Sequence, residues 1–219
     1  MATVLVTGSN KGIGLELCRQ LKDRGEEVIA ACRKTAPELE ALGVRVVPEI
    51  DVADRESVEA LAVALDGKQL DTLINNAGIL SVETLADLDL DRVRAQIEVN
   101  TLGPLRVTSA LLPNLKRGSK VAILTSLMGS IADNGSGGYY GYRISKAAVN
   151  MVGVNLAHDL RKDGISVVLL HPGMVATEMT GGMGISTAES AEGLLARIDA
   201  LTIEDSGSLW HANGERLPW

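Results

Sequence analysis

Short runs of aliphatic residues alternate along this chain with longer stretches in which apolar residues recur at helical spacing. The first run, residues 3–7, leads straight into a glycine-rich turn and then a helical stretch over residues 13–24. Continuous apolar runs of this kind are typical of strands that helices cover on both faces. The pattern therefore predicts that strand and helix alternate along the chain.

The same pattern gives the expected boundaries. Strands are expected at residues 3–7, 27–32, 44–50, 70–75, 120–126 and 165–170, with 207–210 as a further candidate. Helices are expected at residues 13–24, 37–42, 54–65, 90–99, 102–115, 140–162 and 188–200. Asp54 suits the N-cap of its helix. Gly103-Pro104 marks a bend in what is otherwise one long helix over 90–115.

Regular alternation of strands and helices favours an α/β fold with right-handed crossovers. We therefore predict a doubly wound sheet of about seven parallel strands with helices on both faces. No linker, low-complexity tract or change of composition divides the chain, so residues 1–219 are expected to form a single domain. In such a sheet, ligands bind at the carboxyl ends of the strands.

Composition narrows the range of partners. The chain is 46% hydrophobic but has no phenylalanine, so the core must be aliphatic. A net charge of −7 without any basic run argues against nucleic acids and anionic membranes as partners. We find no signal-peptide pattern, membrane span or metal-ligand cluster. Cys18 and Cys32 make no disulfide framework, which favours a reducing, cytoplasmic setting.

The turn after the first expected strand has the properties of a phosphate-binding loop. Its glycines permit a tight turn and a close approach of the backbone to a pyrophosphate, which the free N–H groups of the next helix attract. The strand and helix on either side make a purely structural turn the weaker interpretation. The expected cofactor contacts in this loop are Gly8, Ser9, Asn10, Lys11, Gly12, Ile13 and Gly14.

The end of the second strand indicates which dinucleotide is bound. NAD-preferring enzymes place Asp or Glu there, to bond the ribose 2′-hydroxyl. This chain has Arg33 and Lys34 instead, and Lys11 lies in the glycine loop. Since arginine suits phosphate, these cations predict NADP(H). The alternative is that they are ordinary solvated surface charges.

Two further segments follow expected strands. Asp51-Val52 comes after the third strand and is expected to hold the adenine. The Asn75-Asn76-Ala77-Gly78 segment follows the fourth strand. Its small residues allow the chain to pass close to the cofactor, and its amides can tie neighbouring strand ends together. We therefore expect cofactor contacts from Asn76, Ala77 and Gly78.

Tyr142 and Lys146 are four residues apart in an expected helix, so they lie on one face, one turn apart. A nearby ammonium favours the phenolate, so we expect Lys146 to lower the pKa of Tyr142 toward the range useful for acid–base catalysis. Taken alone, this spacing is common, and a core or interface tyrosine explains it as well. The other motifs, in order along the chain, make the catalytic interpretation the stronger one.

Two more side chains complete the expected catalytic set. Ser126 ends the fifth strand, where its hydroxyl can bond a substrate carbonyl oxygen together with Tyr142. Asn100 lies in the long helix. Its amide can either hold a water for a proton relay or bond backbone at the Gly103-Pro104 bend.

These motifs together resemble the classical short-chain dehydrogenase/reductase family over essentially the whole chain. The matching residues are Thr7-Gly8-x-x-x-Gly12-x-Gly14, Asn75-Asn76-Ala77-Gly78, Asn100, Ser126, Tyr142-x-x-x-Lys146 and Pro172-Gly173. The stretches 126–130 and 140–148 are most similar to the C-factor/sniffer-like carbonyl reductase branch.

The resemblance implies a Rossmann-type fold with seven strands and a catalytic tetrad of Asn100, Ser126, Tyr142 and Lys146. It implies that Tyr142 and Lys146 also contact the cofactor. Near the nicotinamide and pyrophosphate it adds contacts from Pro172, Gly173, Met174, Val175 and Thr177. It also implies NADP(H) as the cofactor, and a homodimer or homotetramer formed by the helices around 102–117 and 140–162.

The chain departs from the family pattern in a few places. The interval between Ser126 and Tyr142 is longer than in many members, which leaves Ser130 as a weaker candidate for the substrate-facing hydroxyl. The additional residues, 133–138, are expected to form a loop beside the cleft. Trp210 is expected to pack in the core, whereas Trp219 could line the site or an interface.

The leading hypothesis is therefore an NADP(H)-dependent oxidoreductase that transfers hydride between the nicotinamide and a small carbonyl or alcohol substrate, with carbonyl reduction favoured. One alternative is a nucleotide-binding sensor or signalling protein of the C-factor type with little catalysis. Another is an epimerase or dehydratase, but such enzymes usually carry a larger C-terminal substrate region.

Overall fold

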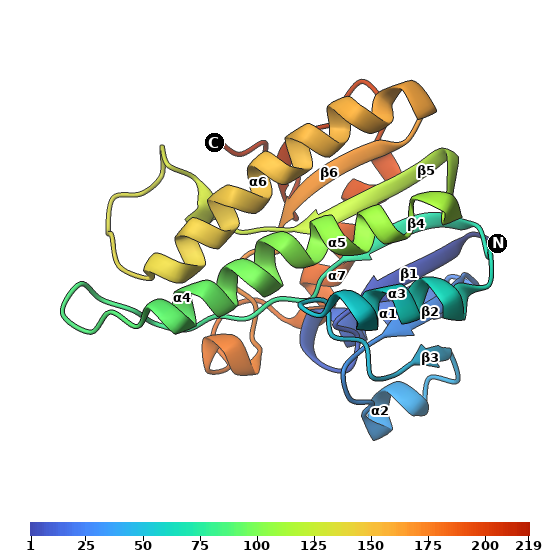
Figure 1. Cartoon of the computed structure of the whole chain (residues 1–219), viewed down its shortest axis with the longest axis horizontal. Helices are drawn as coiled ribbons and strands as arrows, with labels where there is room; N and C mark the ends of the chain where they lie inside the picture. Colours follow the sequence, from blue (N-terminus) through green and yellow to red (C-terminus); the bar gives the residue numbers. More distant parts are fainter.

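The computed structural model describes residues 1–219 and contains a central sheet of seven parallel strands (Figure 1). The strand order is β3-β2-β1-β4-β5-β6-β7. The chain reverses its direction of winding beside β1, which confirms the doubly wound sheet. The strands are β1 (Thr3–Thr7), β2 (Glu27–Ala31), β3 (Arg45–Val47), β4 (Leu70–Asn75), β5 (Leu115–Leu124), β6 (Ser166–His171) and β7 (Ser208–His211).

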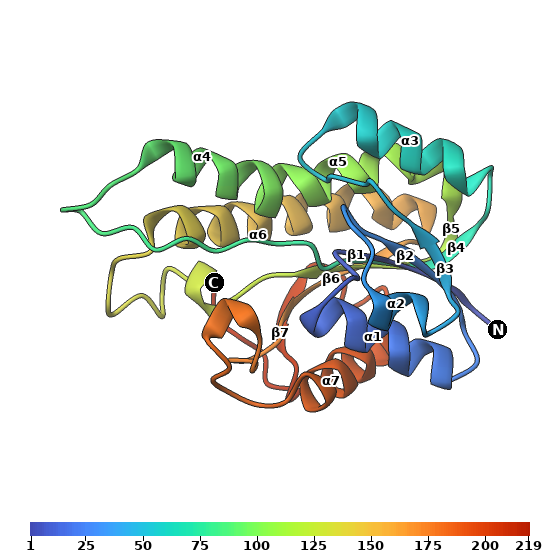
Figure 2. The ribbon, with the colours of Figure 1, turned by 90° about the horizontal axis from the view of Figure 1, so that it is seen from below.

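Helices cover both faces of this sheet (Figure 2). One layer contains α3 (Arg55–Leu65), α4 (Leu90–Ile97), α5 (Gly103–Ala110) and α6 (Tyr140–Leu160). The opposite layer contains α1 (Gly12–Asp23) and α7 (Thr187–Ala200), with the short α2 (Pro37–Glu40) beside them. Asp54 caps α3 as expected, since its side chain accepts a hydrogen bond from Glu56 N–H.

Two aliphatic clusters fill the space between the layers. One, of 21 buried residues, includes Leu73, Ile123 and Val149 and lies under α3, α5 and α6. The other, of 20 residues, includes Val6, Leu17 and Leu194 and lies under α1 and α7. Trp210 packs against this second cluster, as expected. The alternation of the strand side chains between the clusters is that of strands buried on both faces.

The long helix expected over residues 90–115 is interrupted earlier and more strongly than the sequence suggests. A π-helical turn, Glu98–Leu102, separates α4 from α5, and α5 ends at Ala110. A short 3₁₀ turn, Leu112–Asn114, then leads into β5. The expected bend at Gly103-Pro104 therefore lies just after the irregular turn. π-turns are frequent at functional sites, and Asn100 lies in the middle of this one.

Other boundaries differ by smaller amounts. β5 begins at Leu115 rather than at residue 120, because its polar first half continues the sheet beyond a register shift opposite Leu70 and Thr72. β3 is limited to three residues, and β6 and β7 each begin and end one residue later than expected. These differences leave the order of elements unchanged.

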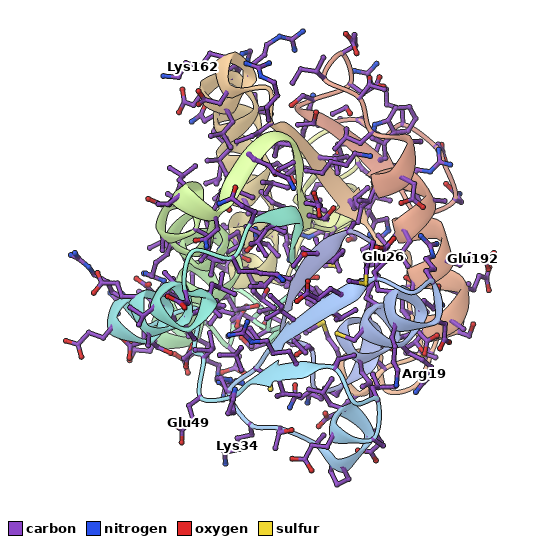
Figure 3. The ribbon with its side chains drawn as sticks, turned by 90° about the vertical axis from the view of Figure 1, so that its right-hand side faces the viewer. Arg19, Glu26, Lys34, Glu49, Lys162 and Glu192 are labelled. Carbon is purple, nitrogen blue, oxygen red and sulfur yellow. The ribbon has the colours of Figure 1, made fainter.

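The carboxyl ends of the strands all lie at one end of the molecule. Three connecting segments gather there: residues 79–89 before α4, residues 131–139 before α6, and residues 174–186 before α7 (Figures 1 and 2). Ala132 N–H bonds the backbone oxygen of Trp219, so the last residues reach the second segment. Charged side chains such as Lys34, Glu49 and Glu192 point outward from the ribbon (Figure 3). No helix is both long and apolar enough to cross a membrane.

Candidate active site

The glycine loop after β1 forms a cradle that has no room for larger side chains. A Cβ on Gly8 would lie 2.8 Å from Ala77 Cα, and one on Gly14 would lie 2.2 Å from Gly8 O. Lys11, the N-cap residue of α1, makes no side-chain capping bond. The first N–H groups of a twelve-residue helix therefore lie at the mouth of a tight glycine turn, an arrangement suited to a pyrophosphate.

Thr7 and Asn76 hold this cradle against the end of β4. Asn76 Nδ2 donates to Thr7 O at 2.9 Å and to Gly8 O at 3.0 Å. The Thr7 hydroxyl accepts hydrogen bonds from Asn76 N–H and Ala77 N–H. Ser9 also has a structural role, because it is fully buried and its hydroxyl donates to Ala31 O at 3.1 Å. The Ser9 side chain is therefore held within the protein, which leaves the Ser9 backbone for the expected cofactor contact.

The cations expected to select NADP(H) are exposed and lie opposite carboxylates. Lys11 Nζ pairs with Glu178, and Arg33 lies 4.0 Å from Asp51. Such exposed pairs contribute little and exchange partners readily. Both cations therefore stay available to a phosphate, and Arg33 lies two residues after the end of β2. Lys34, next along the chain, is also exposed.

Val52, which is expected to contact the adenine, is buried and is contacted by two residues of α5. Arg106 on α5 donates to Val52 O at 2.5 Å and pairs with Glu98 at 3.1 Å. A Cβ on Gly103 would lie 2.9 Å from Val52 Cγ2. Arg106 thus holds the backbone of Val52, and Gly103 packs against its side chain, roles that the sequence did not suggest.

Tyr142 lies in the first turn of α6 and is 9% exposed. Burial raises the pKa of its phenol above the ordinary value, and a hydrogen bond with Ser126 only partly opposes this. The expectation that the pKa of Tyr142 lies below its ordinary value is wrong for this structure, because the net shift is upward. Desolvation of the phenolate dominates, and Lys146 Nζ lies 5.6 Å from the ring centroid. The phenol is therefore protonated at neutral pH.

Ser126 and Ser130 differ in what they contact. Ser126 lies just beyond β5, caps the 3₁₀ turn Leu127–Gly129 and reaches the Tyr142 phenol. Ser130 is 2% exposed, and its hydroxyl accepts a bond from Asp133 N–H. A Cβ on Gly129 would lie 2.7 Å from the Lys146 backbone, so the turn packs directly on α6.

Lys146 is buried one helical turn after Tyr142. Its Nζ donates to Leu124 O at 2.8 Å, at the end of β5. Burial lowers the pKa of the ammonium to about 8. A Cβ on Gly78 would lie 3.8 Å from Lys146 Nζ and 3.3 Å from Asn100 Oδ1. Lys146, Gly78 and Asn100 therefore meet at the carboxyl ends of β4 and β5.

The Asn100 amide makes three hydrogen bonds within the protein. Nδ2 donates to Ile79 O at 2.8 Å and to Ser145 Oγ at 3.0 Å, while Oδ1 accepts from Ile79 N–H at 2.8 Å. Both amide hydrogens are thus used. Of the two expected roles, a backbone bond is the one present, but it is made to Ile79 and not to the Gly103-Pro104 bend. Asn100 thus links the π-helical turn to α6 and to the segment that follows β4.

The segment after β6 borders the same region. Gly173 has a φ of +86°, and a Cβ there would lie 3.4 Å from His211 Cε1. Met174 is exposed, whereas the Val175 side chain is buried, which leaves only its backbone for a cofactor. Thr177 lies beside the glycine loop, since a Cβ on Gly12 would be 3.4 Å from Thr177 Cγ2. The loops after β1 and β6 thus meet as expected.

A pair of histidines that the sequence did not indicate lies at the same end of the sheet. His171 ends β6 and His211 ends β7, with their rings edge to face and 4.8 Å between centroids. Burial, His211 and Lys146 lower the pKa of His171 to about 4, so its ring is neutral. Its Nδ1 is buried without a hydrogen-bond partner. The position of His171 directly before Pro172-Gly173 was the available signal.

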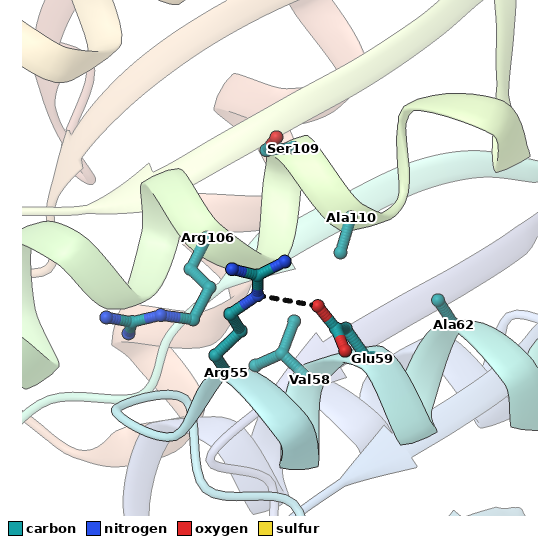
Figure 4. A pocket seen from close by; sticks show the side chains of 7 residues that line it. All are labelled: Arg55, Val58, Glu59, Ala62, Arg106, Ser109 and Ala110. Atoms are coloured by element: carbon teal, nitrogen blue, oxygen red, sulfur yellow. Dashed lines mark hydrogen bonds and ion pairs between the residues drawn. The ribbon is translucent and has the colours of Figure 1, made fainter.

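A separate surface groove of about 380 Å³ lies between α3 and α5, away from this constellation (Figure 4). Arg55 and Glu59 form an ion pair along α3 within it, and Arg106 reaches out of it. No cluster of His, Cys, Asp and Glu in the protein is arranged to hold a metal ion. The polar groups suited to chemistry therefore lie at the carboxyl ends of β1, β4, β5 and β6.

Comparison with known proteins identifies the family of the chain. The family described as short chain dehydrogenase matches residues 2–186. A 1-hydroxy-2-glutathionyl-2-methyl-3-butene dehydrogenase of Rhodococcus sp. is 52% identical over 226 aligned positions, which cover 100% of both chains. The C-signal protein of Myxococcus xanthus is 46% identical over 154 positions, or 68% of this chain and 93% of that protein.

A solved structure resembles the whole molecule. The NADPH-bound carbonyl reductase from chicken fatty liver superimposes with a TM-score of 0.92 at 32% identity, over 100% of this chain and 99% of that one. Fold, family and enzyme class thus agree with the expectations from the sequence.

Proposed function

Because the chain belongs to the short-chain dehydrogenase family, an oxidoreductase family, we propose that Tyr142, Ser126, Lys146 and Asn100 form its catalytic centre and that NADP(H) is its cofactor. The single observation that carries this proposal is a buried, protonated Tyr142 phenol beside Ser126, one helical turn from a buried lysine. The similar chicken carbonyl reductase binds NADPH, which supports the choice of dinucleotide.

When bound, the nicotinamide supplies or accepts the hydride. The residues supply the rest. In the direction of reduction, Ser126 donates a hydrogen bond to the substrate carbonyl oxygen, and Tyr142 transfers its phenolic proton to that oxygen as the alcohol forms. The raised pKa of Tyr142 keeps this proton in place at neutral pH. In the direction of oxidation, the phenol must first lose its proton, so oxidation requires higher pH.

Lys146 and Asn100 prepare the site for these steps. The ammonium of Lys146, which lies near the phenol, stabilises the phenolate left after proton transfer. Asn100 bonds the backbone of Ile79 and the hydroxyl of Ser145. It therefore holds the segment after β4 in a fixed position relative to α6. Lys146 thus contributes by its charge, and Asn100 by keeping the reacting groups in place.

The glycine cradle and the surrounding segments fit the dinucleotide. The open N-terminus of α1 suits the pyrophosphate, and Val52, held by Arg106, suits the adenine. Arg33, Lys34 and Lys11 are placed to neutralise a 2′-phosphate, and no acid follows β2 to bond a 2′-hydroxyl. We therefore propose a preference for NADP(H) over NAD(H).

The substrate is a carbonyl compound or alcohol with apolar parts. The rim of the site carries exposed apolar side chains, which suit contact with such a substrate: Val82, Leu85, Ile131, Met174, Met179 and Met183. The 52% identical Rhodococcus dehydrogenase is named for an alcohol with a glutathionyl group on the neighbouring carbon. A hydroxyalkyl glutathione thioether is therefore the first alcohol to test.

The sensor hypothesis is the weaker one. The C-signal protein matches 68% of this chain, whereas a dehydrogenase matches all of it at higher identity. The proposed centre is also complete in this chain. We propose a cytoplasmic setting as well, since both cysteines are free and buried in the second aliphatic cluster.

The test combines binding with turnover. Affinities for NADPH and NADH are measured first, followed by a panel of aliphatic and aromatic carbonyls, their alcohols and a hydroxyalkyl glutathione thioether. We expect tighter binding of NADPH and cofactor-dependent turnover of at least one class. Equal or tighter binding of NADH would contradict the roles of Arg33 and Lys11. Tight NADPH binding without turnover across the panel would favour the sensor.

A further inference from the structure

Glu83 is a fully buried carboxylate that the proposed catalytic centre does not include. It lies in the segment between β4 and α4, is 0% exposed, and belongs to none of the ion pairs in the structure. Burying a carboxylate without a cation is costly unless several hydrogen bonds replace its water. Its hydrogen-bond partners therefore indicate its role.

Both carboxylate oxygens accept hydrogen bonds from identified donors. Oε1 accepts from Gln96 Nε2 at 3.0 Å and from the Ser81 hydroxyl. Oε2 accepts from Gly141 N–H at 3.1 Å. Gln96 also accepts from Ser81 N–H at 3.0 Å, so the segment after β4 is tied to α4 in several places. The carboxylate thus joins that segment and α4 to the first turn of α6.

The catalytic helix has no N-cap of its own. Tyr139 stands at the N-cap position with a φ of +51°, and its side chain makes no capping bond. Glu83 takes over this role from a position 58 residues away along the chain. Its backbone oxygen accepts from Tyr139 N–H at 2.9 Å, and its carboxylate accepts from Gly141 N–H. A negative charge at this end also suits the helix dipole.

The packing at Gly141 makes this cap sensitive to position. A Cβ on Gly141 would lie 2.2 Å from Gln96 Nε2 and 3.0 Å from Val93 Cα. The first turn of α6 therefore packs against α4 at Gly141, the residue that Glu83 binds. Tyr142 is the next residue, so the location of its phenol depends on this contact.

We propose that Glu83 is a positioning residue for Tyr142: its buried carboxylate caps the catalytic helix from the segment after β4 and holds the phenol in its reactive place. The proposal rests on the proposed catalytic function of Tyr142. A cap that only added stability would alter the free energy of unfolding and leave proton transfer unchanged. A positioning cap alters the rate of the chemical step.

The test uses Glu83→Ala, Glu83→Gln and the matched control Asp54→Ala, which removes the side-chain cap of α3 instead. At a temperature at which all variants are folded, we expect Glu83→Ala to lower kcat by about 10- to 100-fold with an unchanged KM for NADPH, since small misplacements of reacting groups cost this much. Glu83→Gln keeps an oxygen for Gly141 N–H and should recover part of kcat. Asp54→Ala should retain the wild-type kcat.

Amide hydrogen exchange provides a readout that needs no turnover. We expect faster exchange at residues 140–143 in Glu83→Ala, and faster exchange only in α3 in Asp54→Ala. A wild-type kcat in folded Glu83→Ala, or a kcat of Glu83→Gln no higher than that of Glu83→Ala, would overturn the positioning role. Localised exchange at the start of α6 together with an inactive wild-type enzyme would instead contradict the proposed function, not the cap.

Discussion

At Tyr142 and Lys146, burial moves both side chains toward their neutral forms. It raises the pKa of the phenol and lowers that of the ammonium to about 8. The two shifts have different consequences. A protonated phenol can donate its proton to a substrate oxygen. A lysine that titrates near neutral pH can gain or lose its proton as the charge of its surroundings changes. Both shifts follow from the burial of the pair on α6, where Lys146 reaches the end of β5.

Lys146 therefore leads to a prediction about stability. Its folded pKa lies below its ordinary value of 10.5, so the folded state binds fewer protons than the unfolded state between about pH 8 and that value. Stability from this residue is thus lowest below pH 8 and is recovered as pH rises. Relative to Lys146→Met, the free energy of unfolding of the wild type should increase by about 2 kcal/mol from about pH 7.5 to about pH 9.5.

Urea denaturation of both proteins at the two pH values, without cofactor, measures this difference. Comparison with the variant cancels the contributions of groups common to both proteins. Tyr142 does not interfere, because its raised pKa places its titration above this window. Equal pH dependence in the two proteins would contradict the buried, weakened ammonium.

At the scale of elements, the π-helical turn Glu98–Leu102 and the start of α5 connect the proposed catalytic centre to the proposed cofactor site. Asn100 faces Ile79 and Ser145, while Arg106, one turn into α5, holds Val52 O. The same helical unit therefore shapes the wall beside Lys146 and the expected adenine contact.

This connection predicts a selective effect of Arg106→Met, which keeps an apolar stem but loses both hydrogen bonds. The affinity for NADPH should fall by about tenfold, as for the loss of a charge-assisted hydrogen bond, because residues 51–52 lose their support. At saturating cofactor, kcat should stay near the wild-type value. Fluorescence titration and steady-state kinetics separate the two effects, and an unchanged Kd with reduced kcat would refute this role.

The sequence predicted the order of elements well, because apolar runs and helical spacing are local signals. It placed β4 at its exact bounds and Asp54 at its cap. It did not predict the π-turn or the early start of β5, since both depend on contacts with distant strands and helices. The motifs of the proposed catalytic centre were recognisable because their spacing is fixed along the chain.

The residues whose roles the sequence did not indicate show no characteristic spacing along the chain. From the sequence alone, Glu83 is expected to be an ordinary solvated acid in a polar loop. Only the fold brings its carboxylate to α6. Arg106 and His211 likewise gain their roles from segments far away in the sequence. The direction of the pKa shift at Tyr142 was also missed, because residue spacing contains no information about desolvation.

At the scale of the whole molecule, α5 and α6 present exposed apolar side chains on the outer surface. Leu105 and Leu112 come from α5 and the turn after it, and Ile144 and Met151 from α6. These are the helices expected to pair between subunits. We propose that two copies pack through this layer, since a closed symmetric dimer buries such a surface on both copies at once.

The oligomer prediction is tested with Met151→Glu, because Met151 is 62% exposed and lies outside the catalytic contacts. The wild type should sediment as a dimer or tetramer, and the variant should dissociate at micromolar concentration while keeping its fold. Analytical ultracentrifugation and circular dichroism measure the two properties. A monomeric wild type would contradict the proposal, and an unchanged oligomer in the variant would exclude this face.

The central claim is that the Tyr142 hydroxyl carries the proton, and Tyr142→Phe tests it most directly, because the change removes one oxygen from a buried side chain in the first turn of α6. The Kd for NADPH and single-turnover reduction are measured on the variant and the wild type, using a carbonyl substrate from the panel. The account predicts an almost unchanged Kd and a reduction rate lower by about 10²- to 10⁴-fold, the usual contribution of general acid catalysis. A wild-type rate in Tyr142→Phe would contradict it.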